Sequence, residues 1–189
     1  MKNILYVQGD VRNPIGDSKK LICHVVNDRG LMGSGVAKSL YEKWGSVRSK
    51  YYEWHRSGHN FELGNIQAVT INKDIVVINM IGQRDIKVLN GIPPIRYGAI
   101  KQCLEKVSQL ALKYNANIHA PRFGSDRAGG DWSKIEQMIK DELCSKDISV
   151  TVYDLPGTVN PTISTASSIK DISNPISAID LTGLFDVEE

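Results

Sequence analysis

The sequence has little net charge, few cysteines and no long apolar run, and each of these shortages excludes a class of protein. The 23 Lys and Arg residues nearly balance the 21 Asp and Glu residues, so no basic surface for a long nucleic acid is expected. No apolar stretch approaches the roughly 18 residues that a membrane span requires. The first residues also become polar too soon for a signal peptide. We therefore expect a cytoplasmic protein that has no contact with membranes.

Metal-binding and disulfide patterns are also scarce. The three cysteines, Cys23, Cys103 and Cys144, are odd in number and widely separated, which favours reduced, buried thiols over a disulfide framework. His55 and His59 lie four residues apart, but no third ligand accompanies them. The sequence therefore predicts neither a metal site nor a cofactor.

The stretch 33–39 falls short of two nucleotide-binding motifs. Ala37 stands where a P-loop requires glycine, and Lys38 replaces the third glycine of the dinucleotide-binding fingerprint. Both motifs are therefore rejected, and the glycines of this stretch need another explanation.

Apolar periodicity predicts an alternation of strands and helices along most of the chain. Strands are predicted at 4–8, 21–26, 66–71, 75–81, 118–120 and 149–154, and helices at 36–44, 47–54, 97–114 and 132–143. The third and fourth strands are close enough to pair antiparallel, and a loop is predicted at 82–94 because it ends in two prolines. This order predicts an α/β fold with a mixed sheet between helices and right-handed crossovers.

Two glycine-rich loops follow predicted strands. Residues 27–37 contain three glycines before a helix begins, and residues 121–132 repeat this arrangement. Glycines let a backbone approach a ligand closely, and a helix start presents unpaired N–H groups to an anion. Ligands of such sheets bind beyond the carboxyl ends of the strands. We therefore expect the two loops to hold one multiply charged ligand from both sides.

Several polar residues near these loops have two interpretations each. Asp10 either accepts hydrogen bonds from an exocyclic amine or caps a turn. Arg122 either neutralises phosphate or pairs with an acid, and the structural role is favoured. Asp131 precedes an amphipathic helix, so an N-cap is favoured over catalysis. Tyr153 ends the last strand and either stacks on a base or packs in the core.

The composition changes near residue 156, where proline, serine and threonine become frequent and periodicity is lost. We therefore divide the chain into a domain at 1–155 and a flexible tail at 156–189. Leu181, Leu184 and Phe185 form an apolar group in this tail. The tail either contacts an unknown partner through this group or is simply unordered, and its composition favours the second interpretation.

Four stretches taken together resemble the macro domain. They are Gly9-Asp10-Val11, the Gly-x-Gly-Val-Ala loop at 27–37, Pro121-Arg122-Phe123-Gly124 and the closing Val-Thr-Val-Tyr-Asp. The resemblance covers about 3–155. It is strongest to the compact branch that contains ADP-ribose-1''-phosphate phosphatases, the terminal ADP-ribose glycohydrolase and the DNA ADP-ribosyl glycohydrolase antitoxins. It implies a three-layer α/β/α sandwich with about six strands and an ADP-ribose cleft across the top of the sheet.

The resemblance also implies roles for individual residues. By position, Asp10 holds the adenine amine with help from the Val11 amide, and Tyr153 lies against the adenine. The loop 27–36 surrounds the distal ribose, and the loop 123–131 wraps the diphosphate. The implied ADP-ribose-binding residues are Asp10, Val11, Asn27, Gly33, Ser34, Gly35, Val36, Phe123, Gly124, Ser125, Ala128, Gly129, Gly130, Asp131 and Tyr153.

Catalysis departs from the pattern of the family. Gln83 stands where the hydrolases that release ADP-ribose carry a lysine, and a glutamine cannot form an imine. Ala128 stands where some members carry an aspartate, with Asp126 and Asp131 as its acidic neighbours. Direct hydrolysis remains, in which the loops neutralise charge while a polar group orients water. Asp131 and Asn27 are the catalytic candidates.

The predicted function is therefore the binding of ADP-ribose and the hydrolysis of its derivatives. The favoured substrate is ADP-ribose-1''-phosphate, because removal of a terminal phosphate depends mostly on positioning and charge neutralisation. Mono-ADP-ribosyl links are the second possibility. The expected partners are ADP-ribose or an ADP-ribosylated small molecule, protein or nucleic acid. The alternative is a reader module that binds ADP-ribose without turnover.

Overall fold

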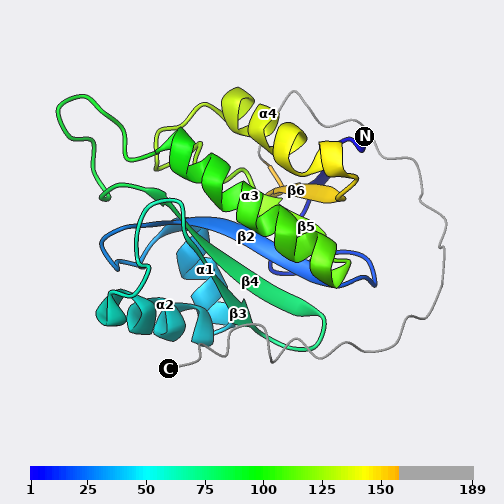
Figure 1. Ribbon diagram of the computed structural model, residues 1–189, viewed down its shortest axis with the longest axis horizontal. Helices are drawn as coiled ribbons and strands as arrows, with labels where there is room; N and C mark the ends of the chain where they lie inside the picture. Colours follow the sequence, from blue (N-terminus) through cyan, green and yellow to red (C-terminus); the bar gives the residue numbers. More distant parts are fainter. Residues whose placement is uncertain (158–189) are drawn as a thin grey trace.

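A six-stranded sheet forms the centre of the structure, a computed structural model that describes residues 1–157 (Figure 1). Its strands are β1 (Leu5–Gln8), β2 (Lys20–Asn27), β3 (Ile66–Thr70), β4 (Ile75–Gln83), β5 (Asn117–Pro121) and β6 (Val150–Asp154). The α-helices are α1 (Gly35–Lys43), α2 (Ser46–Ser57), α3 (Tyr97–Tyr114) and α4 (Trp132–Glu142). A short 3₁₀-helix, η1 (Cys144–Lys146), follows α4 and was not predicted.

The sheet has the order β1-β6-β5-β2-β4-β3. Only β3 runs antiparallel, to β4, and the other neighbouring pairs are parallel. The prediction of a mixed sheet with an antiparallel hairpin in the middle of the chain is therefore confirmed. Because β1, β2, β4, β5 and β6 are parallel, their carboxyl ends meet at one edge of the sheet. Both glycine-rich loops start from this edge.

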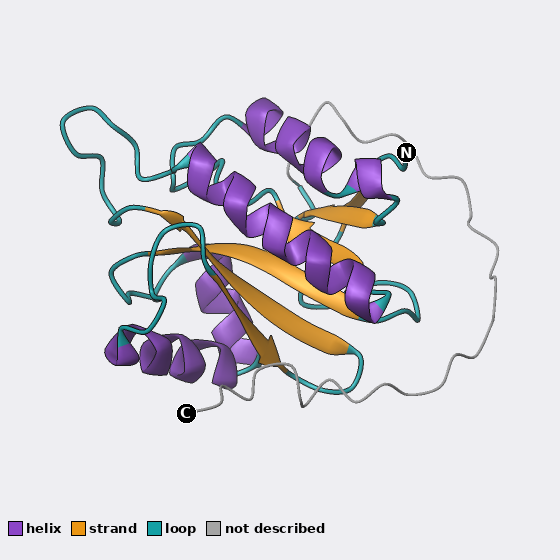
Figure 2. Ribbon diagram, viewed as in Figure 1, coloured by secondary structure: helices purple, strands orange, loops and turns teal. Residues whose placement is uncertain are grey.

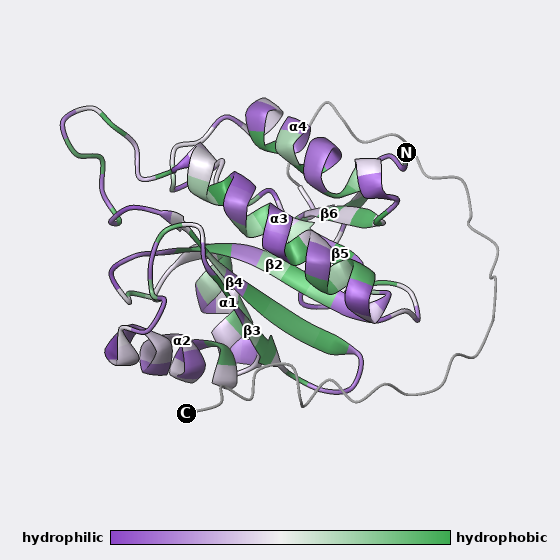
Figure 3. Ribbon diagram, in the orientation of Figure 1, coloured by the Kyte–Doolittle hydropathy of each residue, from purple (hydrophilic) through white to green (hydrophobic). Residues whose placement is uncertain are grey.

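Helices cover both faces of the sheet and produce two separate cores (Figure 2). On one face, α3 and α4 pack on strand residues such as Cys23 and Ile78. On the other face, α1 and α2 pack on Ile22 and Val77. Successive strand residues point to opposite faces, so strands buried on both sides must be apolar almost throughout. This explains why β2 and β4 are largely apolar, each with one polar residue in its interior, His24 and Asn79 (Figure 3), and the three-layer prediction is confirmed.

Left-handed residues end two of the helices, and α2 runs three residues beyond its predicted end. Gly58 closes α2 in the left-handed region with φ of 67°, which glycine adopts without a Cβ penalty. Asn115 closes α3 in the same way. All three cysteines are buried and unpaired, so the prediction of packing thiols is confirmed.

The loop between β4 and α3 differs from its prediction. β4 continues through Gln83, two residues beyond the predicted end, because backbone pairing persists there: Arg84 N–H donates to the Pro94 carbonyl at 2.8 Å. The loop then projects from the domain (Figure 1). The predicted tail lies almost entirely outside the described residues. Within 1–157, no helix combines the length and the apolar character needed to cross a bilayer.

Candidate functional site

A pocket of about 630 Å³ lies at the edge of the sheet where the parallel strands end. Its volume is within the range of small-molecule sites, roughly 300–1,000 Å³. Both glycine-rich loops line it, together with the end of β2 and the start of the loop that follows β4. The two loops are therefore brought together around one space, which is the arrangement that a shared ligand needs.

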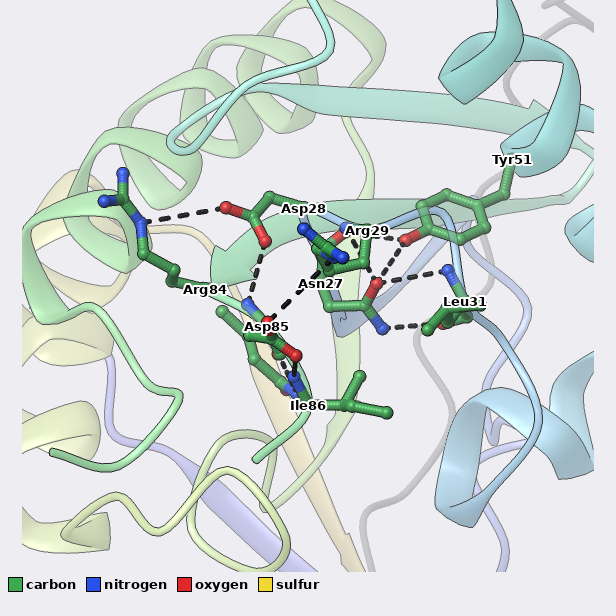
Figure 4. Close-up of polar contacts among 9 residues, drawn as sticks. Asn27, Asp28, Arg29, Leu31, Tyr51, Arg84, Asp85 and Ile86 are labelled. Atoms are coloured by element: carbon green, nitrogen blue, oxygen red, sulfur yellow. Dashed lines mark hydrogen bonds and ion pairs between the residues drawn. The ribbon is translucent and has the colours of Figure 1, made fainter. Parts of the chain in front are cut away.

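Asn27 organises the first loop (Figure 4). Its side-chain Oδ1 accepts hydrogen bonds from the amides of Arg29 at 3.0 Å and Leu31 at 3.1 Å, and its Nδ2 donates to the Leu31 carbonyl at 2.6 Å. The Tyr51 hydroxyl, buried in α2, donates to the Asn27 carbonyl at 2.6 Å. The side chain thus supplies the hydrogen bonds that the irregular backbone of the loop lacks.

A β-bulge and crossed charges join this loop to the loop after β4. Val26 pairs with Ile81 but Asn27 pairs with Gln83, so β4 contains one extra residue at this point. Just beyond, the Asp85 amide donates to Asp28 Oδ1 at 2.8 Å. Two exposed ion pairs cross there, Arg84–Asp28 at 3.7 Å and Arg29–Asp85 at 4.0 Å (Figure 4). These contacts fix one wall of the pocket relative to the other.

The helix α1 begins at the pocket with its amides unpaired. Ser34 occupies the N-cap position but makes no capping hydrogen bond. Among the described residues, no acceptor is found for the backbone N–H groups of 32–37, and 32–37 all line the pocket. Unpaired N–H groups and the helix dipole both favour an anion at such a position.

The second loop offers a similar row of donors. The amides of Gly129 and Gly130 are used inside the loop, donating to Asp126 at 2.9 Å and Gly124 at 2.8 Å. The amides of 124–128 have no acceptor within the part of the chain that the structure describes. A Cβ on Gly130 would lie 2.4 Å from the Gly124 carbonyl oxygen, so only glycine permits this fold of the loop.

The cations of the pocket differ in their partners. Arg122 makes two hydrogen bonds to the buried Asp154, at 2.7 and 2.9 Å, and its guanidinium lies 4.7 Å from the Tyr6 ring. This favours the structural interpretation of Arg122. Lys87 and Arg127 also line the pocket, and neither has an ion pair or a side-chain hydrogen bond within 1–157. They are therefore the cations that a ligand can engage.

A buried histidine contributes to the pocket wall. His24 is 1% exposed, and its Nε2 lies 2.5 Å from Asn79 Oδ1. Asn79 donates to Gln67, which donates in turn to the Lys50 carbonyl. Because a carbonyl can only accept, this relay fixes the proton of His24 on Nε2. Burial lowers the pKa of His24 to about 4, so the ring is neutral at physiological pH.

Some of the predicted binding residues lie on the pocket and others do not. Those that line it are Asn27, Gly33, Ser34, Gly35, Val36, Phe123, Gly124 and Ala128. Those outside its lining are Asp10, Val11, Ser125, Gly129, Gly130, Asp131 and Tyr153.

The three residues predicted to hold the adenine are engaged elsewhere. The Asp10 carboxylate accepts hydrogen bonds from the Arg12 amide at 2.9 Å and from its guanidinium at 2.8 Å. The hydrogen bond from the Arg12 side chain lowers the pKa of Asp10. Val11 and Tyr153 are buried in the core, and the Tyr153 hydroxyl bonds to His119 at 2.8 Å. Their roles toward a base stay predictions.

The predicted catalytic residues also have structural partners. Asp131 Oδ1 accepts hydrogen bonds from the Ser133 amide at 2.9 Å and its hydroxyl at 2.7 Å, as the N-cap of α4. The Ser133 hydrogen bonds lower the pKa of Asp131, which makes it a weaker base. Gln83 and Ala128 both line the pocket. Asp126 is the carboxylate among the lining residues.

Ile86 and Lys87 line the pocket although they lie outside both predicted loops, and Arg127 lies within the second loop but was not named as a binding residue. The Arg127 side chain reaches the first loop and lies 3.7 Å from where a Cβ on Gly35 would be. A basic residue inside a glycine-rich anion loop could have been selected from the sequence. Lys87 carried no such signal, because the direction of its loop depends on contacts with Asp28.

Comparison with known proteins then identifies the fold and the family. No family model matches the chain. A Bacteroides thetaiotaomicron protein of unknown function is 45% identical with a TM-score of 0.80, over 81% of this chain and 98% of its own. DarTG of Thermosipho africanus, solved in complex with ADP-ribose, is 18% identical with a TM-score of 0.67, over 86% of this chain and 44% of its own. That similarity concerns the fold alone.

Mouse chromodomain-helicase-DNA-binding protein 1-like is 29% identical over 164 residues, or 82% of this chain. The chain spans only 18% of the length of that relative. A macrodomain protein from Streptomyces coelicolor is 38% identical with a TM-score of 0.72, over 80% of this chain and 99% of its own. With this degree of identity over nearly the whole of a macrodomain, the chain belongs to the macrodomain family.

Proposed function

We propose that the protein binds ADP-ribose, free or attached to another molecule, in the pocket between the two glycine-rich loops. The observation that carries the proposal is that two stretches with unpaired amides, 32–37 and 124–128, meet at one pocket, which all of their residues except Ser125 line. A diphosphate bridging two sugars matches two anion-binding loops that face a common space. Macrodomain membership and the ADP-ribose complex of the Thermosipho relative support the same ligand.

The proposed geometry places the diphosphate between the loops. Lys87 and Arg127 approach it from the two sides, and the start of α1 contributes its dipole. Each backbone amide contributes about 0.3–1 kcal/mol of charge–dipole stabilisation. Several amides acting together support a dissociation constant in the micromolar range, which corresponds to a binding free energy of about −8 kcal/mol.

Calorimetry with ADP-ribose tests the proposal, and Val36→Glu is the informative variant. Val36 lies in the first turn of α1 and lines the pocket. A glutamate there repels a diphosphate, so we expect at least tenfold weaker binding. Stability is expected to fall only modestly, because the favourable charge at the start of the helix offsets part of the lost packing of Val36 against the core. Ser46→Glu makes the same change at the start of α2, outside the pocket lining, and is expected to leave affinity unchanged. Absence of ADP-ribose binding by the wild-type protein refutes the proposal.

Hydrolysis of ADP-ribose-1''-phosphate is the second candidate function. The observation that favours it is the presence of Asp126 and Lys87 on the same pocket, a carboxylate to orient water and a cation for a terminal phosphate. We expect Asp126→Asn to abolish phosphate release while ADP-ribose binding is kept. If the wild-type protein binds ADP-ribose but releases no phosphate, the reader function alone remains.

A further inference from the structure

The loop between β4 and α3 exposes aliphatic side chains beside the pocket. Five residues with exposed fractions between 44% and 61% form what we call the hairpin patch: Leu31, Ile86, Val88, Leu89 and Ile92. Leu31 comes from the first glycine-rich loop, and the others belong to the loop that projects from the domain, part of which has the apolar colour in Figure 3. Clustered aliphatic side chains at the surface indicate a binding site for another molecule.

The tip of the projecting loop is a regular two-residue hairpin. Leu89 and Ile92 exchange backbone hydrogen bonds of 3.1 and 2.9 Å. Asn90 and Gly91 between them have φ of 52° and 75°, the pattern of a type I′ turn. A defined backbone therefore presents the aliphatic side chains of the tip.

The patch begins on the wall of the pocket and continues beyond it. Leu31 and Ile86 line the pocket, whereas Val88, Leu89 and Ile92 lie outside its lining. A ligand confined to the pocket therefore leaves most of the patch uncovered. A larger molecule that is attached to this ligand, and that leaves the pocket past Leu31 and Ile86, meets the rest of the patch.

The charges around the patch favour a protein over a nucleic acid as the attached molecule. The stretch of loop that carries four of the patch residues has one charged side chain, Lys87. The neighbouring arginines already have carboxylate partners, Arg29–Asp85 at 4.0 Å and Arg84–Asp28 at 3.7 Å. Binding to a phosphate backbone depends on several cations that contact phosphates, whereas aliphatic side chains gain from burial against other apolar groups.

The area of the patch argues against a second copy of the chain as its occupant. Five side chains that are about half exposed offer on the order of a few hundred Å². A stable interface between two proteins buries about 800 Å² on each partner, so this patch alone is too small to hold a dimer. It is large enough to add affinity to a ligand already held in the pocket, since each methylene that becomes buried contributes about fourfold.

We propose that the hairpin patch binds the protein to which the ligand in the pocket is attached, by contacting apolar side chains that flank the attachment site. The pocket holds the ADP-ribose group and the patch holds the neighbouring peptide. The chain therefore prefers ADP-ribose on protein segments rich in aliphatic residues over free ADP-ribose. This inference rests on the proposed function and adds a preference that binding of the nucleotide alone does not require.

Calorimetry with free ADP-ribose and two modified peptides tests this preference. Both short peptides carry ADP-ribose on a central side chain through a linkage that cannot be hydrolysed. Leucine and valine flank the modified residue in the first peptide, and serine and glycine flank it in the second. We expect the first peptide to bind at least fivefold more tightly than free ADP-ribose, and the second to bind within twofold of it.

The double variant Val88→Ser/Ile92→Ser tests whether the patch causes this preference. We expect it to reduce the advantage of the leucine and valine peptide to less than twofold. Its affinity for free ADP-ribose is expected to stay unchanged, because neither residue lines the pocket and the substitutions alter no charge. Leu112→Ser is the matched control, since Leu112 on α3 is as exposed as Ile92, both at 57%, and it is expected to keep the preference.

The outcomes separate this inference from the proposed function. Equal binding of free ADP-ribose and both peptides, or a preference that remains in Val88→Ser/Ile92→Ser, overturns the inference while the proposed function stands. A greater gain for an ADP-ribosylated oligonucleotide than for the leucine and valine peptide also overturns it, as does a dimer in ultracentrifugation that the double variant dissociates. If the wild-type chain binds neither free ADP-ribose nor the peptides, the proposed function fails and the inference fails with it.

Discussion

Replacing Asn27 by alanine tests whether this side chain holds the first glycine-rich loop in place. The variant removes the hydrogen bonds of the side chain with the amides of Arg29 and Leu31 and with the Leu31 carbonyl, and the longer contact of Oδ1 with the Tyr51 hydroxyl at 3.1 Å. The bond from Tyr51 to the Asn27 carbonyl survives, because it involves the backbone. Each lost bond costs about 1 kcal/mol net. The exposed groups of the loop are partly rehydrated, so we expect the free energy of unfolding to fall by about 2–3 kcal/mol.

Urea unfolding followed by tryptophan fluorescence measures this loss, and Asn72→Ala is the control. Asn72 Oδ1 also accepts hydrogen bonds from two amides, Asp74 and Ile75, both at 2.9 Å, but in the exposed turn between β3 and β4. We expect Asn72→Ala to cost about 1 kcal/mol or less and to leave ligand affinity unchanged. Asn27→Ala is also expected to weaken ADP-ribose binding at least tenfold, since the amides of 32–37 lose their positions. If Asn27→Ala and Asn72→Ala have the same unfolding free energy and the same affinity for ADP-ribose, the role assigned to the Asn27 side chain is refuted.

Three further changes have defined outcomes. Gly130→Ala places a Cβ 2.4 Å from a carbonyl oxygen and is expected to cost about 2–3 kcal/mol in urea unfolding, whereas Gly33→Ala, with no atom within 4 Å, is expected to cost under about 0.5 kcal/mol. Burial lowers the pKa of His24 from 6.5 to about 4. The unfolded chain therefore binds the proton first as pH falls, and stability should decrease by about 1 kcal/mol between pH 6 and 5; His24→Gln should lack this part of the slope. Arg122→Ala removes the guanidinium partner of Asp154, whose side chain is 4% exposed. We expect this change to lower the unfolding free energy by about 3–5 kcal/mol in urea unfolding. Adding Asp154→Asn is expected to restore part of the lost stability, because no buried charge is then left.

The strands and helices could be predicted from the sequence because their signals are local. The apolar runs of β2 and β4 and the stripe along α3 depend only on neighbouring residues. The joint position of the two loops followed from one topological rule, that parallel strands end at one edge. The end of β4 was placed too early because the partners of Gln83, Asn27 across a bulge and Ile95 beyond the loop, are distant in sequence.

The side-chain roles at the site could not be predicted in the same way. Asn27 was selected for chemistry, yet its hydrogen bonds serve the loop that follows it, as an Asn directly before a run of glycines can do. Asp131 and Arg122 had the structural role as the favoured alternative, and both occupy it. Lys87 could not be found because its position depends on Asp28, which is far away in sequence.

The first strand of the domain, β1, cannot pair in the sheet until the last strand, β6, has been synthesised. β1 pairs only with β6 in the sheet, and Leu5 lies opposite Thr151, 146 residues further along the chain. At ribosomal rates of roughly 5–20 residues per second, this separation corresponds to about 7–30 s of synthesis. During that time β2, β4 and β3 can already pair among themselves, while β1 has no neighbour. Closing the sheet is therefore the final step on the ribosome, and a nascent chain halted before residue 150 exposes the edge of β5 that β6 later covers.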